Sequence, residues 1–451
     1  MLVSRGVIYT PLRLLVSFAL RCFYRLEVRP APGAPVPASG PVLFVGNHPN
    51  GMVDPAILFA LLPRQVTFLA KSTLFSLPVL GWLLRGLGAL PVYRKQDDPS
   101  QMSRNEGSLE AAAEALAAGR AITLFPEGKS HSEPQLAELK TGAARIAFRV
   151  ARRGAPLVVV PVGLTYGEKH RFRSHVVVQY GAPLPVSEFL PSDEAEEPAR
   201  VRALTDRMAE DLRAVTLNLS EWEELPLVRL AEQLYALTVK EAPNDAERLR
   251  RFAGGIKLFR DEQPERFEAL RRRMLEFQRR LDLVQASTDH LSLEYRAWPV
   301  VRFVLRNGAV LGLGFPLYLC GALLYAVPYQ LAKWAIRARR VEWDLQATFK
   351  LLALLGLSPP WVALVAGATA WFAGGAAALA VLAVALPLAG FTAYFLGRLA
   401  DVRQDVAVFF SLGSRRRLKS GLVAEGERLR AEVEGLADEY RARVVKDAVA
   451  G

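Results

Sequence analysis

The chain has 451 residues, a formal net charge of +12 and 51% hydrophobic residues. This length favours a catalytic domain of ordinary size plus a substantial second region, and it argues against one compact domain. Because the excess positive charge accompanies long apolar segments, an anionic membrane surface is favoured over nucleic acid as a partner. Cys22 and Cys320, the two cysteines, are too few for a disulfide framework or a four-cysteine metal site, which indicates a reducing compartment.

The first predicted element is a helix over residues 7–25, in which four arginines interrupt or flank the apolar positions. Arg13 lies inside this segment and no small-x-small cleavage site follows, which argues against a secretory signal peptide. We expect residues 1–30 to form a membrane-associated helix whose arginines reach out to the polar surface. A helix buried in a globular domain is the alternative.

After a proline-rich linker, residues 41–190 alternate short β-like runs with helix-like stretches such as SLEAAAEALAAG. The β-like runs are PVLFVG, QVTFLA, AITLFP, PLVVVPVGLTY and HVVVQYG. This alternation predicts an α/β domain over residues 31–215. Residues 216–300 are charged, with leucines and phenylalanines at three- and four-residue spacing, and they predict a helical extension packed on or beside that domain.

The composition changes at about residue 308, where two long uncharged segments begin. Residues 308–327 carry no charge over about the 20 residues that a bilayer core requires. Residues 351–397 are uncharged over a length suited to two helices, with a natural break at Gly374 and Gly375. We therefore expect a transmembrane region of two or three helices over residues 301–400, followed by a cytosolic helical tail over residues 401–451.

The segment between these apolar runs is basic, with Lys333, Arg337, Arg339 and Arg340. The positive-inside rule places it on the cytoplasmic side, and we expect an integral membrane protein whose catalytic domain faces the cytoplasm. An odd number of spans would put flanking regions on opposite sides of the bilayer. Either Pro316 marks a re-entrant helix or the count of three is wrong.

Residues 45–55, VGNHPNGMVDP, place a histidine and an acid around a turn. His48 follows a β-like run, so it is expected at the end of a strand, where α/β folds place their sites. Asp54 precedes Pro55 and an apolar run, which is typical of a residue that caps a helix. The same carboxylate could instead bond one imidazole nitrogen and leave the other to take a proton from an alcohol.

Three further segments accompany this turn: GALPVYRK at 88–95, FPEGKSH at 125–131 and VVVPVGLTY at 158–166. In this order and at these intervals, the four blocks resemble those of the glycerophospholipid acyltransferase family, the glycerol-phosphate and lysophosphatidate acyltransferases. The resemblance covers about residues 25–215. It implies an α/β acyltransferase domain with a mixed central sheet flanked by helices.

Two departures from the common family pattern are informative. Five residues, PNGMV, separate His48 from Asp54 where the family usually has four, and FPEGKSH lacks the arginine of the usual FPEGTRS. Both departures resemble the branch of long glycerol-3-phosphate and dihydroxyacetone-phosphate acyltransferases, which also carry hydrophobic C-terminal spans.

The resemblance implies a role for each matching residue. His48 would be the general base, Asp54 its orienting partner and Arg94 a contact to the acceptor's phosphate. Glu127 and Gly128 would help to position the acceptor. The missing arginine leaves several candidates for the rest of the phosphate site: Lys129, Ser130, His131 and Lys140.

The implied reaction is transfer of a fatty acyl group to a hydroxyl of glycerol 3-phosphate or dihydroxyacetone phosphate in phospholipid biosynthesis. The donor would be acyl-CoA or acyl carrier protein, with membrane lipids as partners and no cofactor, metal or nucleic acid. Lysophosphatidate is the alternative acceptor, and a noncatalytic lipid-binding membrane scaffold is the alternative of a different class. A P-loop is disfavoured because Thr123 stands where its first glycine is required, and no G-x-S-x-G motif indicates a serine hydrolase.

Overall fold

The computed structural model describes residues 2–31, 33–94, 98–190, 193, 195–239, 246–284, 286–292, 297–338, 346–413 and 416–450. The chain divides into two compact units. The first contains residues 1–216 and 327–365, and the second contains residues 217–326 and 366–451. The first unit carries the sheet, and the second is built from helices.

The first unit is organised around one mixed sheet of eight strands. The strands are β1 (Tyr24–Arg29), β2 (Val42–Gly46), β3 (Val66–Lys71), β4 (Leu90–Val92), β5 (Ala121–Leu124), β6 (Val158–Tyr166), β7 (Ser174–Tyr180) and β8 (Leu184–Pro185). Their order is β1-β7-β6-β2-β5-β3-β4, and β8 pairs with β6. All neighbouring pairs are parallel except β6 with β7 and β6 with β8.

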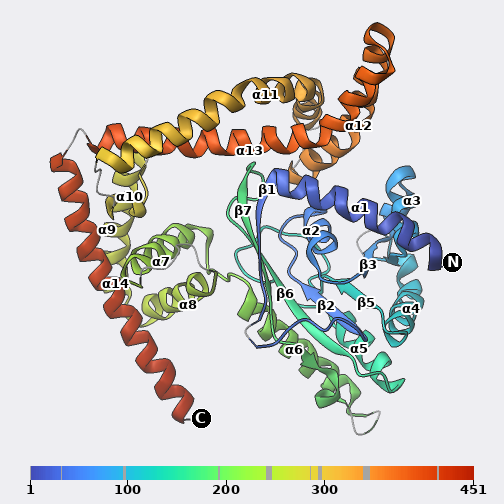
Figure 1. Ribbon diagram of the computed structural model, residues 1–451. Coiled ribbons are helices and arrows are strands. Elements are labelled where there is room, and N and C mark those ends of the chain that lie inside the picture. The colour runs from blue at the N-terminus through green and yellow to red at the C-terminus, as the bar shows by residue number, and fades with distance from the viewer. Residues whose placement is uncertain are drawn as a thin grey trace. The chain divides into compact units, whose positions relative to one another are not determined.

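Helices cover both faces of this sheet (Figure 1). The helices before and after the strands are α1 (Leu2–Phe23), α2 (Val53–Leu61), α3 (Pro78–Leu87), α4 (Asn105–Ala117), α5 (Gly142–Arg152) and α6 (Glu197–Val215). Leu43 and Val45 of β2 enter a core with α4, α5 and α6, whereas Val42 and Phe44 enter a second core with α1 and α2. The alternation follows from the two-residue period of a strand. The predicted α/β fold with a mixed sheet flanked by helices is confirmed.

Helix α1 packs one of its faces against the sheet unit. Leu20 is fully buried, while Leu14 is 68% exposed. The guanidinium of Arg13 donates to the carbonyls of Ala60 and Leu62, at 3.2 and 2.5 Å. These carbonyls stand at the end of α2, where a helix leaves acceptors without intrahelical partners. Arg13 therefore bonds to protein, and one face of α1 is buried, whereas membrane association of its exposed face stays a prediction.

The second unit contains the helices expected for the charged extension. They are α7 (Leu225–Val239), α8 (Ala246–Glu262), α9 (Pro264–Leu283), α10 (Thr288–Ser292) and α14 (Arg416–Ala450). Leu230, Phe277 and Leu429, from α7, α9 and α14, are buried in one shared core. The apolar residues at helical spacing thus pack among these helices.

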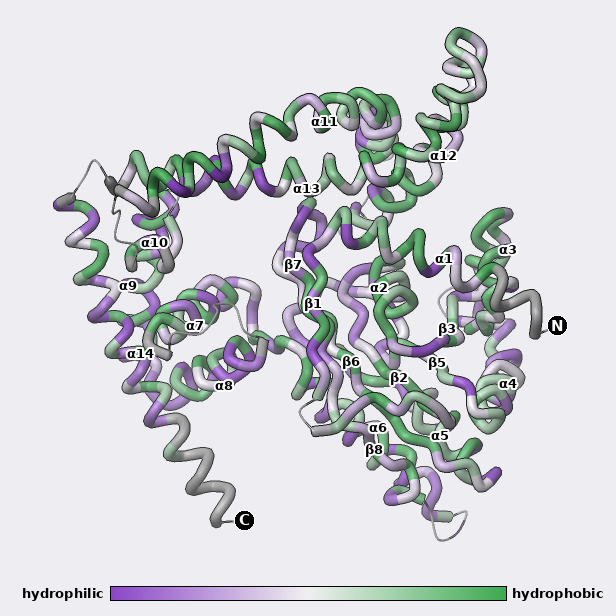
Figure 2. Tube along the Cα trace, viewed as in Figure 1, coloured by the Kyte–Doolittle hydropathy of each residue, from purple (hydrophilic) through white to green (hydrophobic). Residues whose placement is uncertain are grey.

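Three further helices are long and apolar enough to cross a membrane: α11 (Ala297–Ala338), α12 (Gln346–Ala373) and α13 (Gly375–Gly413). Figure 2 shows hydrophobic residues along most of their lengths. Gly374, with φ +86°, separates α12 from α13 at the predicted break. Pro316 lies within the continuous helix α11, and Arg339 and Arg340 lie outside the described residues.

The start of α12 belongs to the first unit, because residues 327–365 group with the sheet. Ala347 and Leu351 are 2% and 6% exposed and lie in the same core as α1 and α2. We expected the whole segment 301–400 to be a separate membrane region. The difference arises because these apolar side chains pack on the sheet unit before the helix continues into its exposed part.

Candidate active site

The four sequence blocks converge on one edge of the sheet. Every strand in the row β6-β2-β5-β3-β4 runs parallel to its neighbours in that row. Their carboxyl ends therefore meet at the same edge, which is where open α/β sheets bind ligands. His48, Arg94 and Glu127 follow β2, β4 and β5, and Tyr166 is the last residue of β6.

His48 and Asp54 form a hydrogen-bonded pair in which His48 Nδ1 lies 2.8 Å from Asp54 Oδ2. A carboxylate can only accept, so Nδ1 carries the proton and Nε2 presents its lone pair. The imidazole stacks on Phe125 with ring centroids 4.1 Å apart, and 12% of the His48 side chain is exposed. The arrangement fits an imidazole held ready to take a proton at Nε2.

Asp54 does more than a helix cap would. Helix α2 is preceded by Met52, and no side chain of that residue caps it. The Asp54 carboxylate is fully buried and also accepts from the Asn50 N–H at 2.6 Å and the Tyr166 hydroxyl at 2.5 Å. Three donors thus surround the Asp54 carboxylate and fix its position beside the His48 ring.

Tyr166 is a site residue that the sequence analysis did not single out. Burial raises the pKa of its hydroxyl well above the ordinary value, and the negative charge of Asp54 raises it further. The hydroxyl therefore stays protonated and donates to Asp54 Oδ1. The segment VGLTY offered a signal for this role, because its tyrosine ends a buried strand at the same sheet edge as His48.

Replacing Tyr166 by phenylalanine is expected to lower kcat about tenfold and the free energy of unfolding by about 1–3 kcal/mol, because a buried acceptor loses its donor. Tyr180→Phe is the matched control, since the Tyr180 hydroxyl is also buried but donates to the Leu61 carbonyl at 3.4 Å. Acyl-transfer kinetics and urea unfolding of both variants check this. Equal kcat values for the two variants would show that the hydrogen bond from Tyr166 to Asp54 does not contribute to catalysis.

Glu127 binds protein groups on both of its carboxylate oxygens and is 3% exposed. Its Oε1 accepts from the His48 N–H at 2.7 Å. Its Oε2 accepts from the Ala137 N–H at 2.9 Å and pairs with the ring of His131. We therefore infer that Glu127 positions the His48 turn, whereas the sequence resemblance implied a role in positioning the acceptor.

His131 is held by protein contacts at both ring nitrogens. Nδ1 accepts from the Glu133 N–H at 3.2 Å, so Nε2 carries the proton toward Glu127. The His131 N–H also donates to the His48 carbonyl at 3.1 Å. His131 therefore supports the turn of residues 47–54 that carries His48 and Asp54, and it is a weaker phosphate candidate than the lysines.

Asn47, which the sequence analysis also missed, fixes the residue before His48. Its side-chain amide donates to the Leu164 carbonyl at 3.0 Å, and its oxygen accepts from the Leu164 N–H at 2.7 Å. The side chain thus extends the pairing of β2 with β6 beyond the end of β2. The sequence signal for this role is an asparagine that stands between a buried strand and a histidine.

The remaining candidates surround Gly128, whose φ of +76° suits only glycine. A Cβ there would lie 2.7 Å from Nζ of Lys140, so the Lys140 ammonium covers this residue. Lys129 is exposed and Ser130 is partly buried. Arg94 is partly buried after β4, three strands from β2 or about 14 Å across the sheet.

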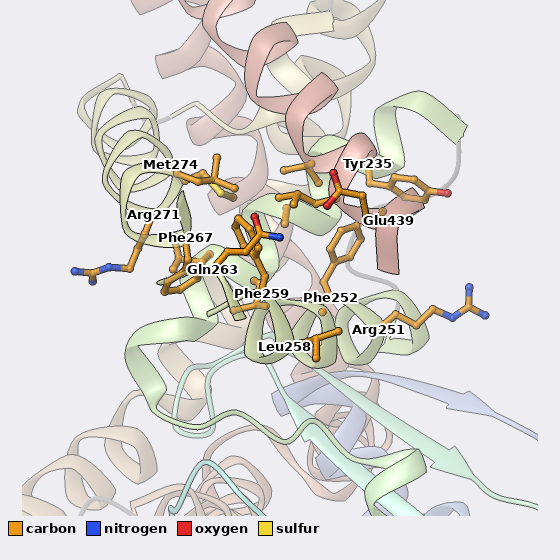
Figure 3. A pocket seen from close by; sticks show the side chains of 18 of the residues that line it. Tyr235, Arg251, Phe252, Leu258, Phe259, Gln263, Phe267, Arg271, Met274 and Glu439 are labelled. Carbon is orange, nitrogen blue, oxygen red and sulfur yellow. The ribbon is translucent and has the colours of Figure 1, made fainter. Parts of the chain in front are cut away.

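A cavity of about 480 Å³ lies in the second unit, among α7, α8, α9 and α14 (Figure 3). The rings of Phe252, Phe259 and Phe267 line it, whereas Arg251 and Arg271 extend away from it. Both arginines pair with glutamates of their own helices. Its described lining residues include no histidine, and the His48–Asp54 pair lies in the first unit.

Among the described residues, no group of three or more His, Cys, Asp or Glu side chains is placed to hold a metal ion. The His48–Asp54 pair, at the carboxyl edge of a mixed sheet, is the arrangement that the four sequence blocks led us to expect.

A family model described as "Acyltransferase" matches residues 28–165, which include the four blocks and both members of the pair. The match covers the strands and turns that carry these residues, so this segment is similar to the domain that the model describes. An uncharacterised acyltransferase of Schizosaccharomyces pombe is 24% identical over 78% of this chain and 67% of its own length. Glycerol-3-phosphate O-acyltransferase 1 of Saccharomyces cerevisiae is 25% identical over 57% of this chain and 46% of its own.

A third relative is shorter and is matched over most of its own length. The 1-acyl-sn-glycerol-3-phosphate acyltransferase of Bacillus subtilis is 28% identical over 190 residues, which are 41% of this chain and 86% of its own. The chain therefore spans about half of the named yeast relative and most of the bacterial one.

Proposed function

We propose that the protein is a membrane-bound acyltransferase that moves a fatty acyl group from a thioester donor to a hydroxyl of glycerol 3-phosphate. The observation that carries the proposal is the His48 Nδ1 contact of 2.8 Å to the buried Asp54 carboxylate, which directs Nε2 to a substrate. The yeast relative supports the choice of acceptor, because its similarity extends over 57% of this chain, beyond the acyltransferase domain.

The pair performs the reaction in two steps. His48 Nε2 takes the proton of the acceptor hydroxyl while its oxygen attacks the thioester carbonyl, and Asp54 stabilises the imidazolium that forms. The tetrahedral intermediate then collapses, the C–S bond breaks, and the leaving thiolate takes the proton from His48. The thiol is a good leaving group, so transfer is direct and needs no acyl-enzyme.

Cations at the same sheet edge would bind the acceptor's phosphate and hold its hydroxyl at Nε2. Arg94 and Lys140 are the leading candidates, because Arg94 follows β4 and the Lys140 ammonium covers Gly128 in the third block. Fixing the acceptor in this way removes orientational freedom before the reaction, which can be worth several kcal/mol. Dihydroxyacetone phosphate and lysophosphatidate carry a phosphate of the same charge.

Three helices with the length and apolar composition of membrane spans support the membrane-bound part of the proposal. Lys333 and Arg337 lie near the end of α11, and by the positive-inside rule this end faces the cytoplasm. Residues 327–365 group with the acyltransferase domain, which supports a position of that domain on the cytoplasmic side. Acyl-CoA and acyl carrier protein are both water-soluble donors that could reach it there.

The test is a side-by-side assay of the purified full-length protein in phospholipid vesicles. Glycerol 3-phosphate, dihydroxyacetone phosphate and lysophosphatidate are each offered with palmitoyl-CoA and with palmitoyl acyl carrier protein. We expect the highest kcat/KM with glycerol 3-phosphate. Preferred use of lysophosphatidate would overturn the acceptor assignment, and absence of transfer in all six reactions would favour a noncatalytic lipid-binding scaffold.

Replacing Arg94 by alanine is expected to raise KM for the acceptor about tenfold or more while KM for the acyl donor changes little, because the lost charge-assisted contact belongs to the acceptor. Arg104→Ala is the matched control, since this exposed arginine lies over the Tyr93 ring in the same region. Steady-state kinetics with each substrate varied in turn provide the measurement. An equal rise in both KM values would remove Arg94 from the phosphate site.

A further inference from the structure

The first two turns of α12 lie against the turn that carries His48 and Asp54. Ala347, Thr348 and Leu351 are 2%, 4% and 6% exposed. Ala347 and Leu351 are in the core that also contains Val53 and Ile57 of α2. A segment almost three hundred residues away along the chain therefore packs beside the catalytic turn.

Thr348 makes a direct hydrogen bond to this turn. Its Oγ1 accepts from the Met52 N–H at 3.2 Å, across a separation of 296 residues. Met52 immediately precedes α2, where the first backbone N–H groups have no partner within the helix. Met52 is the N-cap residue of α2, and Thr348 supplies the acceptor for its N–H from a distant helix.

Lys350 connects the same part of α12 to a second segment beside the site, the connection between β6 and β7. Its Nζ donates to the His170 carbonyl at 2.9 Å. His170 belongs to the connection between β6 and β7, four residues after Tyr166, which donates to Asp54. The Tyr24 hydroxyl also donates to the carbonyl of Lys169 in this connection, at 2.5 Å. One turn of α12 thus bonds to the segments on both sides of Asp54.

The later part of α12 has the properties of a membrane span, since Gln346–Ala373 is one continuous apolar helix. Leu364, Trp371 and Phe372 are 61%, 85% and 86% exposed, in contrast to the buried residues of the first two turns. Pro359 and Pro360 lie inside α12 and remove backbone hydrogen bonds there, so residues 346–358 form the uninterrupted helical part that carries Thr348. Movement of this part would therefore change the position of Thr348 and of the Met52 amide that it holds.

We propose that Thr348 is a positioning residue of the active site. Through its hydrogen bond to Met52, the position of the apolar helix α12 determines the geometry of the His48–Asp54 turn. Thr348 does not contact the reacting atoms; it holds the start of α2, and so the backbone that carries Asp54. This inference rests on the proposed acyl transfer for its kinetic test. The structural part stands on contacts within the first unit alone.

The kinetic test compares three variants of the full-length protein in vesicles. Thr348→Val keeps the side-chain volume but removes the acceptor, and we expect kcat to fall about tenfold with both KM values within about twofold of wild type. Thr348→Ser keeps a hydroxyl and should recover most of kcat. Thr205→Val is the control, because the Thr205 hydroxyl is equally buried but bonds to Val201 within its own helix. Wild-type kcat in Thr348→Val, or equal loss in the serine variant, would overturn the proposal.

Hydrogen exchange separates this proposal from the proposed function, because it requires no turnover. In Thr348→Val, the peptide covering residues 50–58 should exchange at least about threefold faster than in wild type. The same peptide should exchange at the wild-type rate in Thr348→Ser and Thr205→Val. If the wild-type protein transfers no acyl group but this pattern is found, the acyltransferase proposal fails and the positioning role of Thr348 stands. An unchanged exchange rate in Thr348→Val would overturn that role whatever the activity.

Discussion

His48→Ala is expected to lower kcat by about 10²–10⁴, because the reaction loses the group that takes the acceptor's proton. The fold should persist. The backbone bonds of His48 to Glu127 and to His131 do not involve its side chain, and both remain available to alanine. The side chain itself stacks on Phe125 after the end of β2 and lies outside both cores of the first unit. The rate is measured at saturating substrates on protein with an unchanged melting temperature.

His175→Ala is the matched control for this variant. His175 is an exposed histidine of β7, in the same unit, and it belongs to none of the four sequence blocks. Its replacement should leave kcat within about twofold of wild type, as is usual for surface positions. Should His48→Ala and His175→Ala show the same kcat, His48 would not be the general base.

Asp54→Asn is expected to lower kcat by about 10²–10³ with little loss of stability. The amide can reproduce the observed hydrogen bonds: its oxygen in the Oδ2 position accepts from His48 and Asn50, and its NH₂ group faces the Tyr166 hydroxyl, which can rotate to accept. Packing and tautomer are then kept. What the variant lacks is the negative charge that stabilises the imidazolium.

Asp211→Asn serves as the control, because Asp211 pairs with Arg207 on the surface of α6. The free energy of unfolding and kcat are measured for both aspartate variants. Near-normal activity in Asp54→Asn would mean that Asp54 acts only through its hydrogen bonds. In that case the charge of the carboxylate would have no part in the reaction.

The sequence predicted the elements on which the site depends but not the bonds that hold it. Alternating β-like and helical runs predicted the α/β fold, and the position of His48 after a β-like run predicted its place at the sheet edge. Periodicity carries no information on contacts between distant segments, so the bonds of Asn47 to Leu164 and of Tyr166 to Asp54 were not predicted. Glu127 and His131 show the same limit, because their polar groups bind the catalytic turn itself.

Helix α12 shows why composition alone misplaces a boundary. Its uncharged length predicted a membrane span, and the structure has a helix of that length and composition. Hydropathy cannot distinguish an apolar side chain that faces lipid from one that packs on a domain. Leu351 is buried against the first unit, whereas Leu352, one position further along, is 45% exposed. Only tertiary structure separates the two environments.

The central claim is that His48 and Asp54 act as one catalytic unit, and a double-mutant cycle tests it most directly. kcat for acyl transfer to glycerol 3-phosphate is measured for wild type, His48→Ala, Asp54→Asn and the double variant, in vesicles and at saturating substrates. If Asp54 acts through the His48 imidazole, the double variant retains about the activity of His48→Ala, because the carboxylate has no imidazolium left to stabilise. Losses that multiply, so that the double variant falls below His48→Ala by the full factor of Asp54→Asn, would contradict the account.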